Sequence, residues 1–260
     1  MTDRLQLYKR LIGIPFLDLG PIPNFSNMKH EALQAYASNQ LMTMNSRNPV
    51  DDTYLNLSVE GVFDYKGLPE IASRCDSCLP EYQIRGKMHV PFVTGEKTVA
   101  TQFSKQVPLL KNYISDLLDH PGRARFSVLN AHTDVGWHSH YYGKHKIDHT
   151  ELTLHIVLST NHKVLAEVGR CDFAALDQEE TGTNEWFKDP EQVYSTHFTE
   201  GRLWLLNSRH SHRFTNTSDQ ERVHTWITTY FFDHQGNPIN ENLYRLIEQA
   251  VNEYSGIIIE

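Results

Sequence analysis

Cysteine is scarce in this chain, with three among 260 residues: Cys75, Cys78 and Cys171. An odd and sparse count does not make the disulfide framework of a small secreted domain, so it favours a reducing, cytoplasmic compartment. Cys75 and Cys78 have the spacing of half a zinc or redox site. The sequence holds no second pair with that spacing, so a structural zinc site is not expected.

Long apolar runs and basic clusters are also missing. No stretch approaches the about 20 consecutive apolar residues that cross a bilayer, and residues 1–16 lack the pattern of a cleavable signal. Lys and Arg number 24 against 32 Asp and Glu, a net charge of −8. This balance, spread along the whole chain, argues against nucleic acid or an anionic membrane as partner. We find no internal repeat and no low-complexity tract.

The composition is otherwise that of a globular protein, with 39% hydrophobic and 11% aromatic residues. The length fits one large domain, because sheet-rich domains often reach this size. We expect a mixed helical cap over residues 1–100, packed on a β-rich core over residues 101–235. A C-terminal helix over residues 236–260 would belong to the same domain.

Hydrophobic periodicity predicts helices at residues 28–42, 103–119 and 239–254. Strand-like alternation appears at residues 123–130, 151–159, 202–206 and 222–232. Short alternating strands separated by turns are typical of a sandwich or jelly roll, not of a parallel α/β sheet. The expected fold is therefore mainly β with flanking helices.

The alternation also assigns faces to two of these strands. In residues 151–159 the apolar positions lie on one face, and His155 lies on the other. In residues 222–232 Arg222 and His224 share the polar face. If the apolar faces pack against helices, the polar faces line a cavity that can hold a metal and an anionic ligand.

Histidine is abundant, with 15 residues, and ten of them fall in two groups: six from His132 to His155 and four among residues 197–224. His138 and His140 are two apart, so in extended chain both point the same way. His212 follows much later, at the end of the segment that begins after Gly201. Two nearby ligands and one distant histidine have the spacing of a non-heme iron facial triad. Arg222 follows on the next strand, where its guanidinium can bind a carboxylate.

The segment from His212 to His224, HRFTNTSDQERVH, resembles the distal-histidine segment of the aspartyl/asparaginyl β-hydroxylase family. Bacterial proline hydroxylases of the cis-4 type are similar there too. Residues 201–207, 154–161 and 130–140 resemble other segments of that family. The resemblance covers residues 101–232 and implies a double-stranded β-helix, a jelly roll of cupin type. It also implies an oxygenase that uses Fe(II), with 2-oxoglutarate as cosubstrate.

The resemblance assigns roles to residues of this sequence. His138 would be the first iron ligand and His212 the distal one. Arg222 would bind the far carboxylate of 2-oxoglutarate, His155 would hold the near carboxylate, and Ser127 would be a further contact.

Two positions depart from the family pattern. His140 stands where the family commonly has Asp or Gly, so the third ligand is open between His140, a water and Asp134. His132 with Asp134 forms an alternative ligand pair. Thr153 stands where the family has an arginine two residues before the central histidine.

The implied activity is hydroxylation of an amino acid, free or within a peptide, with release of succinate and CO2. Trp137, Tyr141 and Tyr142 are the expected substrate contacts. One alternative is a cosubstrate-free dioxygenase that binds iron through three histidines, with Arg222 holding the carboxylate of the substrate. The other is a β-helix module that binds a small acid without turnover.

Overall fold

The computed structural model describes residues 2–38, 42–47, 54–65, 98–118, 124–137, 151–170, 190, 192–208, 210–231 and 241–259. The described elements, in chain order, are α1 (Thr2–Leu11), β1 (Phe16–Pro21), α2 (Phe25–Ser38), β2 (Met42–Arg47), β3 (Tyr54–Tyr65), β4 (Thr98–Ala100), η3 (Phe103–Lys105), α6 (Pro108–Leu117), β5 (Ala124–Leu129), β6 (Thr133–Asp134), β7 (Glu151–Ser159), β8 (Val164–Gly169), β9 (Val193–Thr196), β10 (Arg202–Leu206), β11 (Ser211–Asn216), β12 (Arg222–Tyr230) and α8 (Glu241–Glu253).

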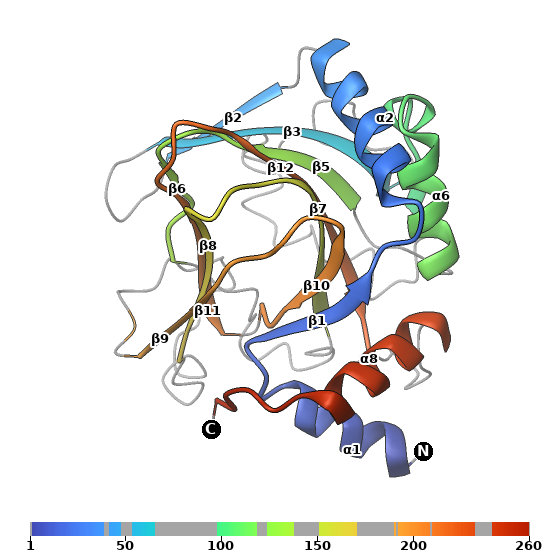
Figure 1. Ribbon diagram of the computed structural model, residues 1–260, viewed down its shortest axis with the longest axis vertical. Helices are drawn as coiled ribbons and strands as arrows, with labels where there is room; N and C mark the ends of the chain where they lie inside the picture. The colour runs from blue at the N-terminus through green and yellow to red at the C-terminus, as the bar shows by residue number, and fades with distance from the viewer. Residues whose placement is uncertain are drawn as a thin grey trace.

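Two antiparallel sheets face each other (Figure 1). The larger has eight strands in the order β1-β10-β7-β12-β5-β3-β2, with β4 paired to β3, and the smaller has the order β6-β11-β8-β9. From β5 onward the chain passes back and forth between the sheets. β5, β7, β10 and β12 lie in the larger sheet, and β6, β8, β9 and β11 lie in the smaller one. Eight strands wound between two sheets in this way form a jelly roll, so the predicted double-stranded β-helix is confirmed.

The predicted elements of the core are present. The four alternating segments form β5, β7, β10 and β12, and the three helical segments form α2, α6 with η3, and α8. Pro108 occupies the first turn of α6 and separates it from η3. Proline suits that position because the first helical N–H groups have no partner within the helix.

The first hundred residues contribute strands as well as helices. β1 pairs with β10, and β3 pairs with β5, so this segment extends the larger sheet on both sides of the four core strands. The sequence did not predict these strands. The predicted boundaries of the cap, core and C-terminal helix, at residues 100 and 235, stay predictions.

The alternation on β7 separates two hydrophobic clusters. Leu154 and Ile156 belong to the cluster between the larger sheet and the helices, and Val157 belongs to the cluster between the two sheets. In Figure 1 the helices lie on one side of the larger sheet and the smaller sheet lies on the other. The apolar face of β7 therefore packs on the helices, as predicted, and its other face points between the sheets.

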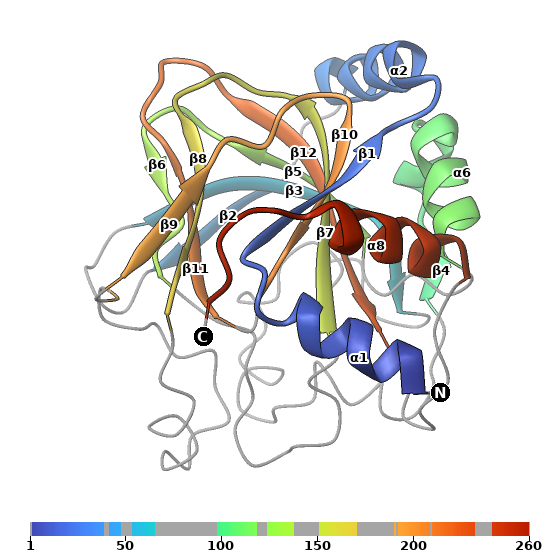
Figure 2. The same ribbon diagram turned by 60° about the horizontal axis from the view of Figure 1, so that its bottom comes forward.

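The first and last helices lie side by side (Figure 2). Arg4 forms an ion pair with Glu241 at 2.8 Å, and Arg10 Nη1 donates to Asn252 Oδ1 at 2.8 Å. Ile259 N donates to Gly13 O at 2.7 Å, which holds the chain end beside the start of β1. None of the described helices combines the length and apolar character needed to span a membrane.

Candidate functional site

Strand register brings the predicted cosubstrate residues to one face of the larger sheet. His224 on β12 lies opposite Ser127 on β5, and Trp226 on β12 lies opposite His155 on β7. Directly opposed residues of an antiparallel pair point to the same side of the sheet. Ser127, His155, Arg222 and His224 therefore share the face that points toward the smaller sheet, and all four are buried.

Arg222 is the first residue of β12 and is 1% exposed. Its guanidinium carbon lies 4.5 Å from the ring centroid of Phe214 and 6.0 Å from that of Phe198. Among the described residues, none of its three side-chain nitrogens has a hydrogen-bond partner. The nearby acids are engaged elsewhere, since Asp219 pairs with His132 at 2.8 Å and Glu221 accepts from Tyr36 at 2.7 Å. A buried guanidinium that has no acidic partner in the described part of the chain is suited to bind an anion.

The electrostatics of this interior favour an anionic ligand. In the described part of the chain, no buried side chain is acidic. Burial lowers the pKa of Arg222 to about 9, so the guanidinium keeps its charge at neutral pH. Burial, and then the charges of Arg222 and His155, hold the pKa of His224 well below its ordinary value. His224 is therefore a neutral imidazole at pH 7, and it offers one N–H donor.

Aromatic rings surround the guanidinium. His155 and His224 stack with centroids 5.6 Å apart, and the His155 ring lies 5.0 Å from that of Phe214. Phe198 stacks on Trp204 at 4.7 Å. The buried Trp204 Nε1 and His224 Nδ1 atoms have no hydrogen-bond partner within the described residues. The rings thus form an apolar wall that also carries polar atoms for a bound acid.

His212 is 2% exposed and lies on β11, opposite Val168 of the inter-sheet cluster. His212 Nδ1 lies 2.9 Å from His210 O. A carbonyl only accepts hydrogen bonds, so Nδ1 carries the proton and Nε2 carries the lone pair. A neutral imidazole whose other nitrogen is fixed by a carbonyl is the usual state of a histidine that ligates a metal.

The other predicted ligands and substrate contacts lie outside the described residues: His138, His140, Tyr141 and Tyr142. Their roles stay predictions. Within the part of the chain that the structure describes, no three His, Cys, Asp or Glu side chains gather to hold a metal.

Asp134, His132 and Trp137 face away from the inter-sheet interior. Asp134 forms an ion pair with Arg213 at 3.1 Å, and the Arg213 guanidinium lies 4.7 Å from the Trp137 ring centroid. Arg213 follows His212 on β11, and neighbouring strand residues point to opposite faces. The side chain of His132 is 65% exposed and pairs with Asp219. These contacts do not favour the alternative ligand pair of His132 and Asp134 or a substrate contact by Trp137, and both stay predictions.

The sequence assigned no role to several residues of this site. The sequence places His224 on the polar face of its strand, two residues after Arg222. That spacing is the signal that could have assigned His224 a role in the site. The same alternation on β10 could have placed Trp204 in the site, because Trp204 lies opposite His155. Phe198 comes from the loop before β10, where no periodicity marks it.

No protein-family model matches the chain, and no curated protein matches it. Among solved structures, the chain is similar to the epimerase SnoN in complex with Fe3+, alpha ketoglutarate and nogalamycin RO. The identity is 10%, the match covers 87% of this chain and 83% of that chain, and the TM-score is 0.49. An oxidoreductase of the 2OG-Fe(II) oxygenase family from Burkholderia pseudomallei matches with 10% identity, coverage of 92% and 94%, and a TM-score of 0.48.

A Pseudomonas putida prolyl-4-hydroxylase matches with 10% identity, coverage of 87% and 98%, and a TM-score of 0.44. At these values the similarities assign neither a substrate nor a role to any residue.

Proposed function

We propose that this protein is an Fe(II)- and 2-oxoglutarate-dependent dioxygenase that hydroxylates an amino acid, free or within a peptide. The observation that carries the proposal is the buried guanidinium of Arg222 between the two sheets, which has no hydrogen-bond partner among the described residues. An isolated buried charge is costly, and a carboxylate with two oxygens matches the planar fork of arginine.

The donors around Arg222 fit 2-oxoglutarate. Arg222 would hold the far carboxylate, with His224 as a neutral donor two residues along the same strand face. His155 would bind toward the near carboxylate, together with Ser127. The arginine that the family resemblance expects at position 153 is Thr153, whose hydroxyl donates to Ser208 Oγ at 3.0 Å. This threonine is engaged within the protein, so we assign the near carboxylate to His155.

The donor chemistry of His212 fits Fe(II), because its Nδ1–H is committed to a carbonyl and its Nε2 carries the lone pair. His138 would be the second ligand, with His140 or water as the third. When bound, the iron would supply the oxygen chemistry that couples decarboxylation of 2-oxoglutarate to hydroxylation of the substrate.

The protein's own contribution is orientation and exclusion of water. Arg222 would fix one end of the dicarboxylate between the two sheets. Phe214 lies between Arg222 and His212, because it contacts Arg222 and is two residues from His212 on the same face of β11. The rings of Phe198 and Phe214 shield the guanidinium from water and so strengthen its interaction with the carboxylate.

Anaerobic calorimetric titration with Fe(II) and 2-oxoglutarate, followed by a screen of amino acids and peptides for succinate release, tests the proposal. We expect 2-oxoglutarate to bind and succinate to form in step with a hydroxylated product. Oxygen uptake without 2-oxoglutarate would instead favour the three-histidine dioxygenase. Binding of a small acid without iron binding would favour the non-catalytic module.

A further inference from the structure

Resting on the proposed function, we propose that Asn216 is a positioning residue for Arg222. Asn216 is the last residue of β11 and is 1% exposed. Its carboxamide joins the turn between β11 and β12 to the end of β5. Arg222 begins β12 directly after that turn.

The amide nitrogen of Asn216 faces three carbonyls. Nδ2 donates to Gln220 O at 2.7 Å, Asn130 O at 2.9 Å and Leu129 O at 3.3 Å. The first carbonyl belongs to the turn, and the other two belong to the end of β5 and the residue that follows it. One side chain therefore fastens the turn to a strand of the other sheet.

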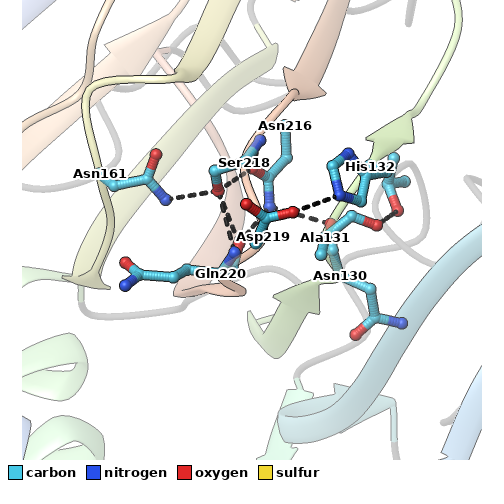
Figure 3. Close-up of polar contacts among 9 residues, drawn as sticks. Asn130, Ala131, His132, Asn161, Asn216, Ser218, Asp219 and Gln220 are labelled. Carbon is cyan, nitrogen blue, oxygen red and sulfur yellow. Dashed lines mark hydrogen bonds and ion pairs between the residues drawn. The ribbon is translucent and has the colours of Figure 1, made fainter.

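The carbonyl oxygen of Asn216 holds the middle of the same turn (Figure 3). Asn216 Oδ1 accepts from Ser218 N at 3.1 Å and lies 2.7 Å from Ser218 Oγ. Ser218 Oγ accepts from Gln220 N at 3.2 Å and from Asn161 Nδ2 at 2.9 Å. The network thus bonds the N–H groups of Ser218 and Gln220 and the carbonyl of Gln220 within the turn.

The network determines where Arg222 begins its strand. Arg222 pairs with Leu129 in the β12–β5 register, and it follows Gln220 by two residues. Asn216 bonds the carbonyls of both Leu129 and Gln220, so it holds the two backbone segments between which Arg222 is placed. The guanidinium has no hydrogen-bond partner among the described residues, so its direction depends on this backbone and on the rings of Phe214 and Phe198.

The test uses Asn216→Ala in the full chain, with two readouts. Phenylglyoxal modifies exposed arginines, and mass spectrometry of the peptide that contains Arg222 reports its protection without any cosubstrate. We expect Arg222 to react slowly in the wild type, where the reagent must enter between the sheets, and faster in the variant. We also expect 2-oxoglutarate affinity to fall about 10- to 100-fold, the range typical of residues that orient a ligand's direct contacts. Affinity for Fe(II), measured anaerobically, should stay within about twofold of the wild type, whereas general loosening would lower both affinities together.

Thr217→Ala is the matched control, because Thr217 lies in the same turn but its hydroxyl, among the described residues, bonds only Lys163 O of the β7–β8 connection. It should leave both readouts unchanged. Ser218→Ala removes a smaller part of the network. It should change the reactivity of Arg222 and the affinity for 2-oxoglutarate in the same directions, by smaller amounts. This variant tests the role of Asn216 if Asn216→Ala does not fold.

The positioning role is overturned if Arg222 stays protected and 2-oxoglutarate affinity stays at the wild-type value in a folded Asn216 or Ser218 variant. It is equally overturned if phenylglyoxal modifies Arg222 at the same rate in the wild type and in Asn216→Ala. Failure of the wild type to bind 2-oxoglutarate contradicts the proposed function instead, and the protection of Arg222 then still decides the role of Asn216.

Discussion

Replacing Arg222 with methionine should change stability and cosubstrate binding in opposite directions. The guanidinium is 1% exposed and has no hydrogen-bond partner among the described residues. Exchanging a poorly compensated buried charge for a hydrophobic residue of similar length is often neutral or stabilising by about 1–4 kcal/mol. The lost contact with the Phe214 ring offsets about 0.5–2 kcal/mol of that gain. We therefore expect Arg222→Met to raise the free energy of unfolding of the ligand-free protein by about 1–2 kcal/mol.

Binding of 2-oxoglutarate should be lost in the same variant. Removing one partner of a buried charged pair costs about 2–5 kcal/mol, which is a loss of roughly 30-fold to several thousand-fold in affinity. Urea unfolding of the ligand-free protein measures the first effect, and anaerobic calorimetry measures the second. The stabilisation that 2-oxoglutarate gives to the wild type through mass action should also disappear.

Arg213→Met is the matched control for this exchange. Arg213 also lies against an aromatic ring, but it has carboxylate partners in Asp134 and Glu167 and points away from the interior. It should lower stability slightly and leave 2-oxoglutarate affinity unchanged. A less stable Arg222→Met protein that binds 2-oxoglutarate as the wild type does would refute the argument.

Three further predictions follow from the site. His212→Ala should abolish Fe(II) binding in anaerobic equilibrium dialysis, and retention of wild-type affinity would exclude His212 as a ligand. Asp134→Asn should leave Fe(II) affinity within about twofold of wild type, because Asp134 pairs with Arg213 on the outer face; a large loss would return Asp134 to the ligand set. Because the fold lowers the pKa of His224, the unfolded chain takes up its proton first as pH falls below about 6.5. Wild-type stability should therefore fall relative to His224→Gln by up to about 1.4 kcal/mol per pH unit below that value, and parallel urea-unfolding profiles of the two proteins would contradict the buried, neutral state.

The polar face of the site could be predicted because strand alternation is strict. Period two alone predicts that His155 on β7 and Arg222 on β12 lie on the polar faces of their strands, and the sheet register places both between the sheets. Strand alternation predicts the orientation of a side chain only for residues within recognisable strands. Phe198 comes from a loop, and its stacking on Trp204 depends on packing that no local pattern encodes.

The orientation of Asp134 illustrates a second limit. His132 has a φ of 54°, a left-handed conformation that turns the chain just before the two-residue strand β6. Such a short strand carries no periodicity to show which way its side chains point. The strands of the first hundred residues were missed for a related reason, since β1 and β3 are stabilised by pairing with β10 and β5, which lie far along the chain.

A dicarboxylic acid should bind to the buried guanidinium between the sheets. The decisive measurement is anaerobic calorimetric titration of 2-oxoglutarate into the Fe(II)-loaded wild type and into Arg222→Met. We expect stoichiometric binding to the wild type and a loss of at least about 30-fold in the variant. Equal affinity in the two proteins, or no binding to an iron-loaded wild type, would contradict it.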